Sequence, residues 1–437
     1  MSDDATVRLW DRTIGAVSLE SGAAAAIFQY DPRFVRSGIR VSPLTMPPRV
    51  APYVFPNLSE PTFKRLPGLL ADSLPDRFGS AVFDTWLASQ GRRPDTVSAV
   101  ERLCYMGTRG MGALEFEPAI GPSRSPSDEL SIGKLVELAS AILSERQDFI
   151  TRLKEGREEA ALLDILSVGA SAGGARAKAV VAWNPETGSI RSGQVDAGPE
   201  FEHWLLKFDG VTGVDANDGL EEPQGYGAIE YAYSKMALEA GLTMSKCRLL
   251  KENGREHFMT RRFDRPAGNT KLHAQSLGAL AHYDFNQPGA HSYEQALLAM
   301  RQLGLPMAEI EQQFRRMAFN VIARNQDDHV KNIAFLMDPE GRWSLSPAFD
   351  VTYAYRPSGG PTALHQMSIN GKQDGFEISD LKQCAEVGSM KRGRVATIVG
   401  EVREAVANWP GHAAEAGVRE HDIERIGQVH RLDLGSS

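Results

Sequence analysis

The segment 314–350 constrains the fold most, because it joins a buried helix to a polar loop and then to a short hairpin. Apolar residues recur at positions 314, 317, 318, 321 and 322, a spacing that predicts a helix with one face in the core. The apolar pattern ends at Arg324, and the polar run NQDDHVKN follows at 325–332. Two short apolar runs, 333–337 and 343–345, flank the turn sequence DPEG at 338–341 and predict an antiparallel hairpin.

The hairpin predicts which polar side chains lie together. If its strands pair about residue 340, Asn332 falls opposite residue 348, and the open end collects five polar residues. These are Asp327, His329, Lys331, Asn332 and Asp350. Oxygen ligands from Asn and Asp suit Mg²⁺, a further carboxylate can accept a hydroxyl proton, and a lysine can offset phosphoryl charge. Protein kinases likewise place a catalytic Asp five residues before a metal-binding Asn, with a second metal-binding Asp further on. The alternative is a solvated polar loop that ends a helix.

Two further features point to a bound nucleotide. Lys207 lies in the otherwise apolar run WLLKF at 204–208, where a lysine is costly unless it is paired. Glu230, near the start of a predicted helix at 226–240, is a candidate partner, and kinases hold ATP phosphates with such a pair. The alternative is a lysine at a strand end that reaches water. The run GASAGGAR at 169–176 offers backbone N–H groups to phosphates, although it is not GxGxxG, precedes a strand and also fits a plain turn.

Composition narrows the class of protein. The net charge of −8 argues against a chain that coats nucleic acid unaided, since such proteins rely on Lys and Arg. Three distant cysteines and no Cys/His cluster make a zinc site improbable and fit a reducing compartment. The acidic N-terminus is not a secretory signal, and no apolar run approaches the ~18–20 residues that span a bilayer. We expect a cytoplasmic protein that does not contact membranes.

Length and local patterns suggest two domains. At about 150 residues per domain, 437 residues allow two or three. The first 60 residues predict short strands, and helices follow. We place the boundary near residue 150, so that 1–150 is a small β-containing module with helices and 151–437 is the core that carries the ATP and Mg²⁺ site. The predicted fold class is α+β, a two-lobed kinase-like core behind a small β-containing domain.

The order of these motifs resembles the HipA-type serine/threonine kinases, the toxin half of bacterial toxin–antitoxin pairs. The resemblance covers nearly the whole chain. It is carried by the loop at 171–178, the lysine strand at 205–208, the hinge RFDR at 262–265, the loop at 325–332, the segment 345–350, MSINGK at 367–372, and the N-terminal motifs FQYD at 28–31, LPD at 74–76 and GAL at 112–114.

The resemblance implies a role for each matching residue. Asp327 would be the general base, with Lys331 beside it in the catalytic loop, and Asn332 and Asp350 would hold Mg²⁺. Ser171 would be the autophosphorylated loop serine, and phosphate there would place about −2 charge where the ATP phosphates must sit. The implied ATP-binding residues are Gly173, Gly174, Ala175, Arg176, Ala177, Lys178, Lys207, Glu230, Arg261, Arg262, Phe263, His329, Lys331, Asn332, Phe349 and Asp350.

The chain departs from the family pattern at two positions. Asp328 adds a carboxylate beside the base, and like-charge coupling would raise the pKa of Asp327. Arg261 is basic where an acidic residue can occur, which affects the expected nucleotide preference. The resemblance also implies a HipB-like helix-turn-helix antitoxin, DNA contact only through that complex, and a protein substrate, for which an aminoacyl-tRNA synthetase is one candidate.

Two rival functions belong to other classes. A catalytically weak nucleotide-binding scaffold would act as corepressor with the antitoxin. A metal-dependent phosphohydrolase would use Asp327, Asp328 and His329, and would have no need of Lys207.

Overall fold

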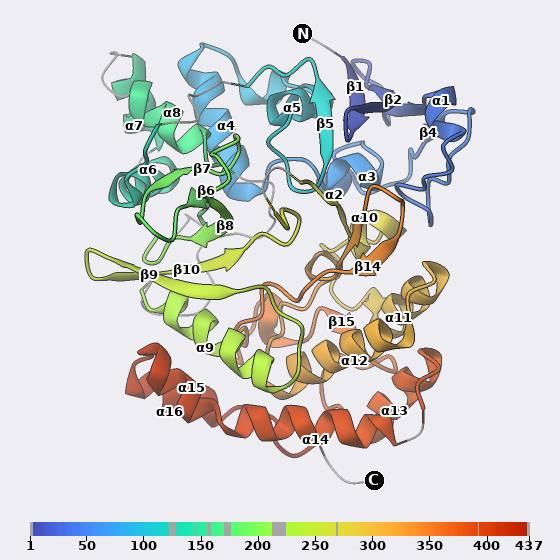
Figure 1. Cartoon of the computed structure of the whole chain (residues 1–437), viewed down its shortest axis with the longest axis vertical. Coiled ribbons are helices and arrows are strands. Elements are labelled where there is room, and N and C mark those ends of the chain that lie inside the picture. Colours follow the sequence, from blue (N-terminus) through green and yellow to red (C-terminus); the bar gives the residue numbers. More distant parts are fainter. Residues whose placement is uncertain are drawn as a thin grey trace.

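The computed structural model describes residues 3–121, 128–144, 146–154, 159–169, 176–211, 224–267, 270–391 and 393–434. An N-terminal module lies at one end of the long axis, beside the helices of a sheet lobe whose strands extend to the middle of the molecule, and a helical lobe lies at the other end (Figure 1). The predicted α+β fold class, a kinase-like core behind a β-containing N-terminal domain, is confirmed.

The N-terminal module is built on an antiparallel sheet in the order β4-β3-β2-β1-β5. Alternate residues of its strands, such as Val7, Leu9 and Phe28, are buried, as expected for a sheet with one face in a core. Its strands are β1 (Asp4–Leu9), β2 (Arg12–Ser18), β3 (Ile27–Tyr30), β4 (Tyr53–Val54) and β5 (Leu114–Glu117). Its helices are α1 (Pro32–Val35), α2 (Glu60–Phe63), α3 (Gly68–Ala71), α4 (Arg77–Ser89), the 3₁₀ turn η1 (Pro94–Thr96) and α5 (Ala99–Met106).

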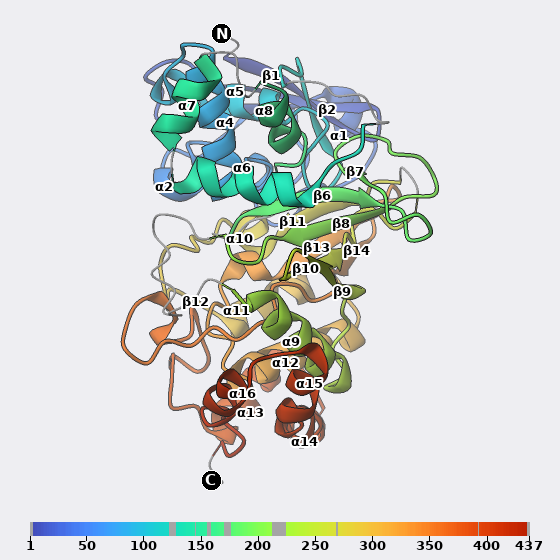
Figure 2. The same cartoon turned by 90° about the vertical axis from the view of Figure 1, so that its left-hand side faces the viewer.

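The sheet lobe has the strand order β7-β6-β8-β10-β9. One face packs under helices that precede it in the chain, and Figure 2 shows α6 lying along β6 and β8. Trp204 and Leu206 point into that core, so Lys207 on the same strand points to the opposite face, toward α9. The strands are β6 (Lys178–Trp183), β7 (Ile190–Ser192), β8 (Glu202–Lys207), β9 (Cys247–Glu252) and β10 (Arg255–Arg261). The helices are α6 (Ile132–Ser144), α7 (Arg146–Lys154), α8 (Glu159–Leu166) and α9 (Tyr226–Glu239).

The helical lobe contains the segment that constrained the fold. All five apolar positions of the predicted stripe are at most 1% exposed in α12, and the hairpin pairs Phe335 with Leu345 and Met337 with Trp343, centred on residue 340 as predicted. The helices are α10 (Leu277–Ala281), α11 (Tyr293–Gln302), α12 (Met307–Ile322), α13 (Ile378–Val387), α14 (Arg394–Ala407), α15 (Trp409–Ala416) and α16 (Glu420–Gly427). The short elements are β11 (His273–Ser276), β12 (His291–Ser292), η2 (Val330–Asn332), β13 (Ala334–Met337), β14 (Trp343–Leu345), η3 (Pro361–Ala363) and β15 (Met367–Ser368).

The expected domain limit at residue 150 falls inside α7. Helices α4, α6, α7 and α8 share one core with β6 and β8, so packing continues across that position. The division into 1–150 and 151–437 therefore stays a prediction, and it does not coincide with an element boundary.

Within the described ranges, no helix combines the length and the apolar character needed to cross a bilayer.

Candidate active site

A buried lysine between two carboxylates lies at the centre of the candidate site. Lys207 Nζ, at the end of β8, lies 2.5 Å from Glu230 Oε1 on α9 and 2.5 Å from Asp350 Oδ1 beyond the hairpin. The Lys207 side chain is 12% exposed and that of Glu230 is 2% exposed. The cluster joins the sheet lobe to the helical lobe, because residues 143 positions apart share one ammonium group.

The charges in this cluster fix its protonation. Burial alone would lower the pKa of Lys207, but Asp350 and Glu230 together raise it above its ordinary value. Burial would likewise raise the pKa of Asp350, yet the positive charges of Lys207 and Lys178 hold it well below its usual range. Asp350 also has a φ of +55°, a left-handed conformation that is uncommon outside glycine and concentrated at functional sites. At neutral pH the site presents an ionised carboxylate beside a protonated lysine.

The loop 325–332 lies beside this cluster. The Asn332 side-chain amide donates to the Asp327 carbonyl at 2.8 Å, which leaves the amide oxygen of Asn332 unused by that contact. The Asp327 side chain is 50% exposed, and its Oδ1 lies 3.9 Å from His329 Nε2. Asn325 Nδ2 donates to the Asp350 carbonyl at 3.5 Å, which ties the start of the loop to the segment after the hairpin.

Lys331 lies at the edge of the predicted cluster, where its ammonium group is 3.9 Å from Asp72 Oδ1 and 5.0 Å from the centre of the Phe285 ring.

The donor set fits Mg²⁺. A carboxylate from Asp350 and an amide oxygen from Asn332 are hard oxygen ligands, the kind that Mg²⁺ takes in small number while it keeps waters or phosphate oxygens. The buried Nδ1 of His329 has no hydrogen-bond partner, so a polar ligand would also satisfy it.

Asp328 behaves differently from its neighbour. It is 3% exposed and accepts hydrogen bonds from the Tyr293 hydroxyl (2.7 Å), from His365 Nδ1 (2.7 Å) and from the Gln366 backbone N–H (2.8 Å). Burial opposes its ionisation, but His365 and these hydrogen bonds lower its pKa. The expectation that Asp328 presents a second carboxylate beside the base is wrong, because its side chain is turned into the core.

That orientation also weakens the phosphohydrolase alternative. Both oxygens of Asp328 are occupied by protein donors, so the carboxylate is not available to a metal ion. In the part of the chain that the structure describes, no group of three His, Cys, Asp or Glu side chains could hold a metal.

The expected adenine-binding segment lies at the end of β10. Arg261 Nη1 is 3.6 Å from Glu202 Oε1, and the rings of Phe263 and Phe349 are 5.6 Å apart. The Arg262 side chain is buried against Asp264, and its backbone N–H donates to the His203 carbonyl at 2.9 Å. The roles of these residues stay predictions.

The glycine-rich loop is described only in part. Ser171, Gly173, Gly174 and Ala175 lie outside the described residues. Arg176 lies over the Tyr226 ring at 3.7 Å, the Ala177 carbonyl accepts from Phe208 N–H at 3.0 Å, and Lys178 pairs opposite Lys207 in the β6–β8 ladder.

Two aspartates of the N-terminal module reach the site, and sequence reasoning did not assign them a role there. Asp76 caps α4 through Oδ1, which accepts from Gly79 N–H at 2.7 Å, while its Oδ2 lies 3.8 Å from the buried ammonium group of Lys178. Burial raises the pKa of Asp76 to about 6, although Lys178 opposes the shift. Asp72 accepts from Ser276 N–H at 2.7 Å and lies near Lys331. The motif LPD at 74–76 was the available signal, but its Asp looks like a local helix cap.

Fold and site together define a protein with a kinase-like core behind a β-sheet module. The chain belongs to the HipA family, since the HipA N-terminal domain matches residues 5–117 and the HipA-like C-terminal domain matches residues 170–409.

One solved structure has the same fold as this chain. The complex of HipA, HipB and operator DNA from Shewanella oneidensis MR-1 gives a TM-score of 0.64 at 14% identity, covering 98% of this chain and 95% of that chain, which shows a common fold. The Helicobacter pylori proinflammatory kinase CtkA gives a TM-score of 0.34 at 12% identity, covering 53% of this chain and 89% of that chain, which is too low to support an argument. A search of curated protein sequences found no match.

Proposed function

We propose that the chain is an ATP- and Mg²⁺-dependent protein serine/threonine kinase and the toxin of a HipBA-type pair. The Lys207–Glu230–Asp350 cluster carries this proposal. A phosphohydrolase has no need of a buried lysine shared by two carboxylates from different lobes, whereas phosphoryl transfer needs a fixed positive charge at the nucleotide phosphates.

Each residue of the site has a proposed role in phosphoryl transfer. Lys207 would contact the ATP phosphates, with Glu230 holding its side chain in place. Asn332 and Asp350 would hold Mg²⁺, which when bound supplies charge to neutralise the phosphates. Asp327 is half exposed, as required of a base that must meet the hydroxyl of another protein, and Asn332 fixes its backbone. His329 and Lys331 would lie beside the transferred phosphoryl group.

The partners follow from family membership. The Shewanella oneidensis relative was solved with HipB and operator DNA. We propose that this chain also binds a HipB-like helix-turn-helix antitoxin and meets DNA through that complex, which agrees with its net charge of −8. The protein substrate would be another macromolecule with an accessible Ser or Thr, and an aminoacyl-tRNA synthetase is one candidate.

The decisive experiment uses the full chain, Mg²⁺ and γ-labelled ATP, with Asp327→Asn beside it. We expect label on protein, including Ser171, and a loss of about 10²-fold or more in the variant. Phosphatase pretreatment of both proteins removes any phosphate already present. ATP binding without transfer would favour the scaffold that acts as corepressor. The absence of both ATP binding and phosphotransfer would refute the proposal.

A further inference from the structure

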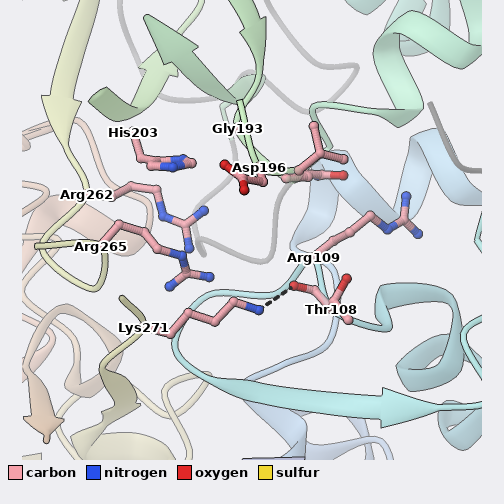
Figure 3. A pocket seen from close by; sticks show the side chains of 10 residues that line it. Thr108, Arg109, Gly193, Asp196, His203, Arg262, Arg265 and Lys271 are labelled. Carbon is pink, nitrogen blue, oxygen red and sulfur yellow. Dashed lines mark hydrogen bonds between the residues drawn. The ribbon is translucent and has the colours of Figure 1, made fainter. Parts of the chain in front are cut away.

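A basic hollow of about 380 Å³ lies where the N-terminal module meets the sheet lobe (Figure 3). Its wall comes from residues 108–109 after α5, from 193–196 after β7, from His203 on β8, and from Arg262, Arg265 and Lys271 after β10. The lining does not include Lys207, Asp327, Asn332 or Asp350, although it shares Arg262 with the expected adenine-binding segment.

The hollow carries buried positive charge in excess. Asp264 is fully buried and accepts from Arg262 at 2.7 and 2.9 Å and from Arg265 Nη1 at 2.7 Å, so two guanidinium groups share one carboxylate. Arg262 is 3% exposed and Arg265 is 7% exposed. A buried charge without a full counter-charge is unfavourable, and an anion at the wall would relieve it.

The remaining charges do not cancel this excess. Lys271 pairs with Glu115 at 2.6 Å and donates to the Thr108 carbonyl at 3.3 Å. Arg109 stacks on Tyr105, and Asp196 is the acidic residue of the lining. The four basic side chains that line the hollow are those of Arg109, Arg262, Arg265 and Lys271. With the three carboxylates of Asp196, Asp264 and Glu115 counted against them, the net charge is +1.

His203 is the second, independent observation. Its side chain is nine-tenths buried, and its Nδ1 has no hydrogen-bond partner. Figure 3 shows it extending toward the same space as Arg262, Arg265 and Lys271. Burial, and then the charges of Arg262 and Arg265, lower the pKa of His203 to about 4, so the imidazole is neutral at pH 7, and a polar group of a bound molecule would satisfy its Nδ1.

We propose that this hollow binds a small phosphorylated molecule, whose phosphate lies between Arg265, Lys271 and His203. A guanidinium group can donate two parallel hydrogen bonds to two oxygens of one phosphate. The hollow is larger than a phosphate group alone would fill, so it has room for the rest of a small molecule. Such a ligand would contact the N-terminal module and the segment after β10 at once. Its binding does not depend on phosphotransfer.

The first test titrates inorganic phosphate into the full chain and follows the melting temperature, with sodium chloride at matched ionic strength as reference. The titration is run with and without Mg²⁺ and a non-hydrolysable ATP analogue. We expect a saturable rise that persists with the analogue present, and Lys271→Gln should weaken phosphate binding about tenfold. Arg342→Gln, a change at an exposed hairpin arginine, is the matched control and should bind phosphate like the wild type.

A second measurement does not depend on variants. Bound phosphate should raise the pKa of His203, followed by its imidazole NMR signals, because a nearby anion favours the charged ring. Three results would overturn the proposal: no saturable effect beyond chloride, equal weakening by Lys271→Gln and Arg342→Gln, or an unchanged His203 titration in saturating phosphate. Binding of duplex DNA that phosphate does not compete with would also overturn it, in favour of a nucleic-acid surface. An inactive kinase that still binds phosphate would refute only the proposed function.

Discussion

Asp327 and Asp328 are adjacent in sequence, and the structure predicts that substituting Asp328 lowers stability whereas substituting Asp327 lowers activity. The Asp328 carboxylate accepts three hydrogen bonds of 2.7–2.8 Å in a buried site. Asp328→Asn replaces one oxygen by an amide group that cannot accept, so the bonds at Oδ2 from Tyr293 and His365 are lost or reversed. At ~1.5–3 kcal/mol for each hydrogen bond to a buried charge, we expect the free energy of unfolding to fall by about 3 kcal/mol.

Asp327→Asn should leave the free energy of unfolding within ~0.5 kcal/mol of the wild type, because the side chain is half exposed. It should nevertheless lower phosphotransfer about 10²-fold or more. Urea unfolding followed by fluorescence gives both stabilities, and γ-labelled ATP gives both activities.

The comparison of the two variants is the control, because both remove one charge from the same loop. If Asp328→Asn were as stable as the wild type, the buried network would not support the loop as described. If Asp327→Asn were destabilised as strongly as Asp328→Asn, the difference in side-chain exposure between the two residues would not explain why one supports catalysis and the other stability.

Three other predictions follow from the same geometry. Lys207→Met should weaken binding of the ATP analogue at least tenfold, as measured by calorimetry. Lys251→Met changes an exposed lysine and should leave this affinity unchanged. If both variants bound the analogue equally well, Lys207 would not belong to the nucleotide site. Asp264→Asn should lower the free energy of unfolding in urea by ~3–5 kcal/mol, because two buried guanidinium groups lose their carboxylate, and a stable variant would contradict this. Burial lowers the pKa of His273 from 6.5 to about 4, so the unfolded chain binds more protons between these values and stability falls as pH drops from 6.5 to 4. His273→Gln should reduce the slope of urea stability against pH in that window by up to one proton, and an unchanged slope would exclude His273 as a contributor.

The sequence predicted those parts of the site that depend on local periodicity. The stripe in α12 and the turn at 338–341 were enough to centre the hairpin on residue 340, while the joint role of Asn332 and Asp350 stays a prediction. A lysine in an apolar strand required a partner, and Glu230 lies 2.5 Å from it.

Features that depend on contacts between distant segments were not predictable in this way. The loop at 325–332 is irregular, so no period separates the outward Asp327 from the inward Asp328, whose partners lie 35–38 residues away along the chain. Asp76 satisfies a local helix-capping pattern, and its proximity to Lys178 appears only once the module is folded against the sheet lobe.

The N-terminal module contacts both the sheet lobe and the helical lobe. Through Asp76 it lies against Lys178 of the sheet lobe, and through Asp72 it is bonded to Ser276 of the helical lobe. A rotation that opens the lobes must stretch or break one of these contacts. If the chain binds nucleotide as proposed, substitutions in the module should therefore change how fast nucleotide enters and leaves, even where they leave the proposed phosphotransfer step unchanged.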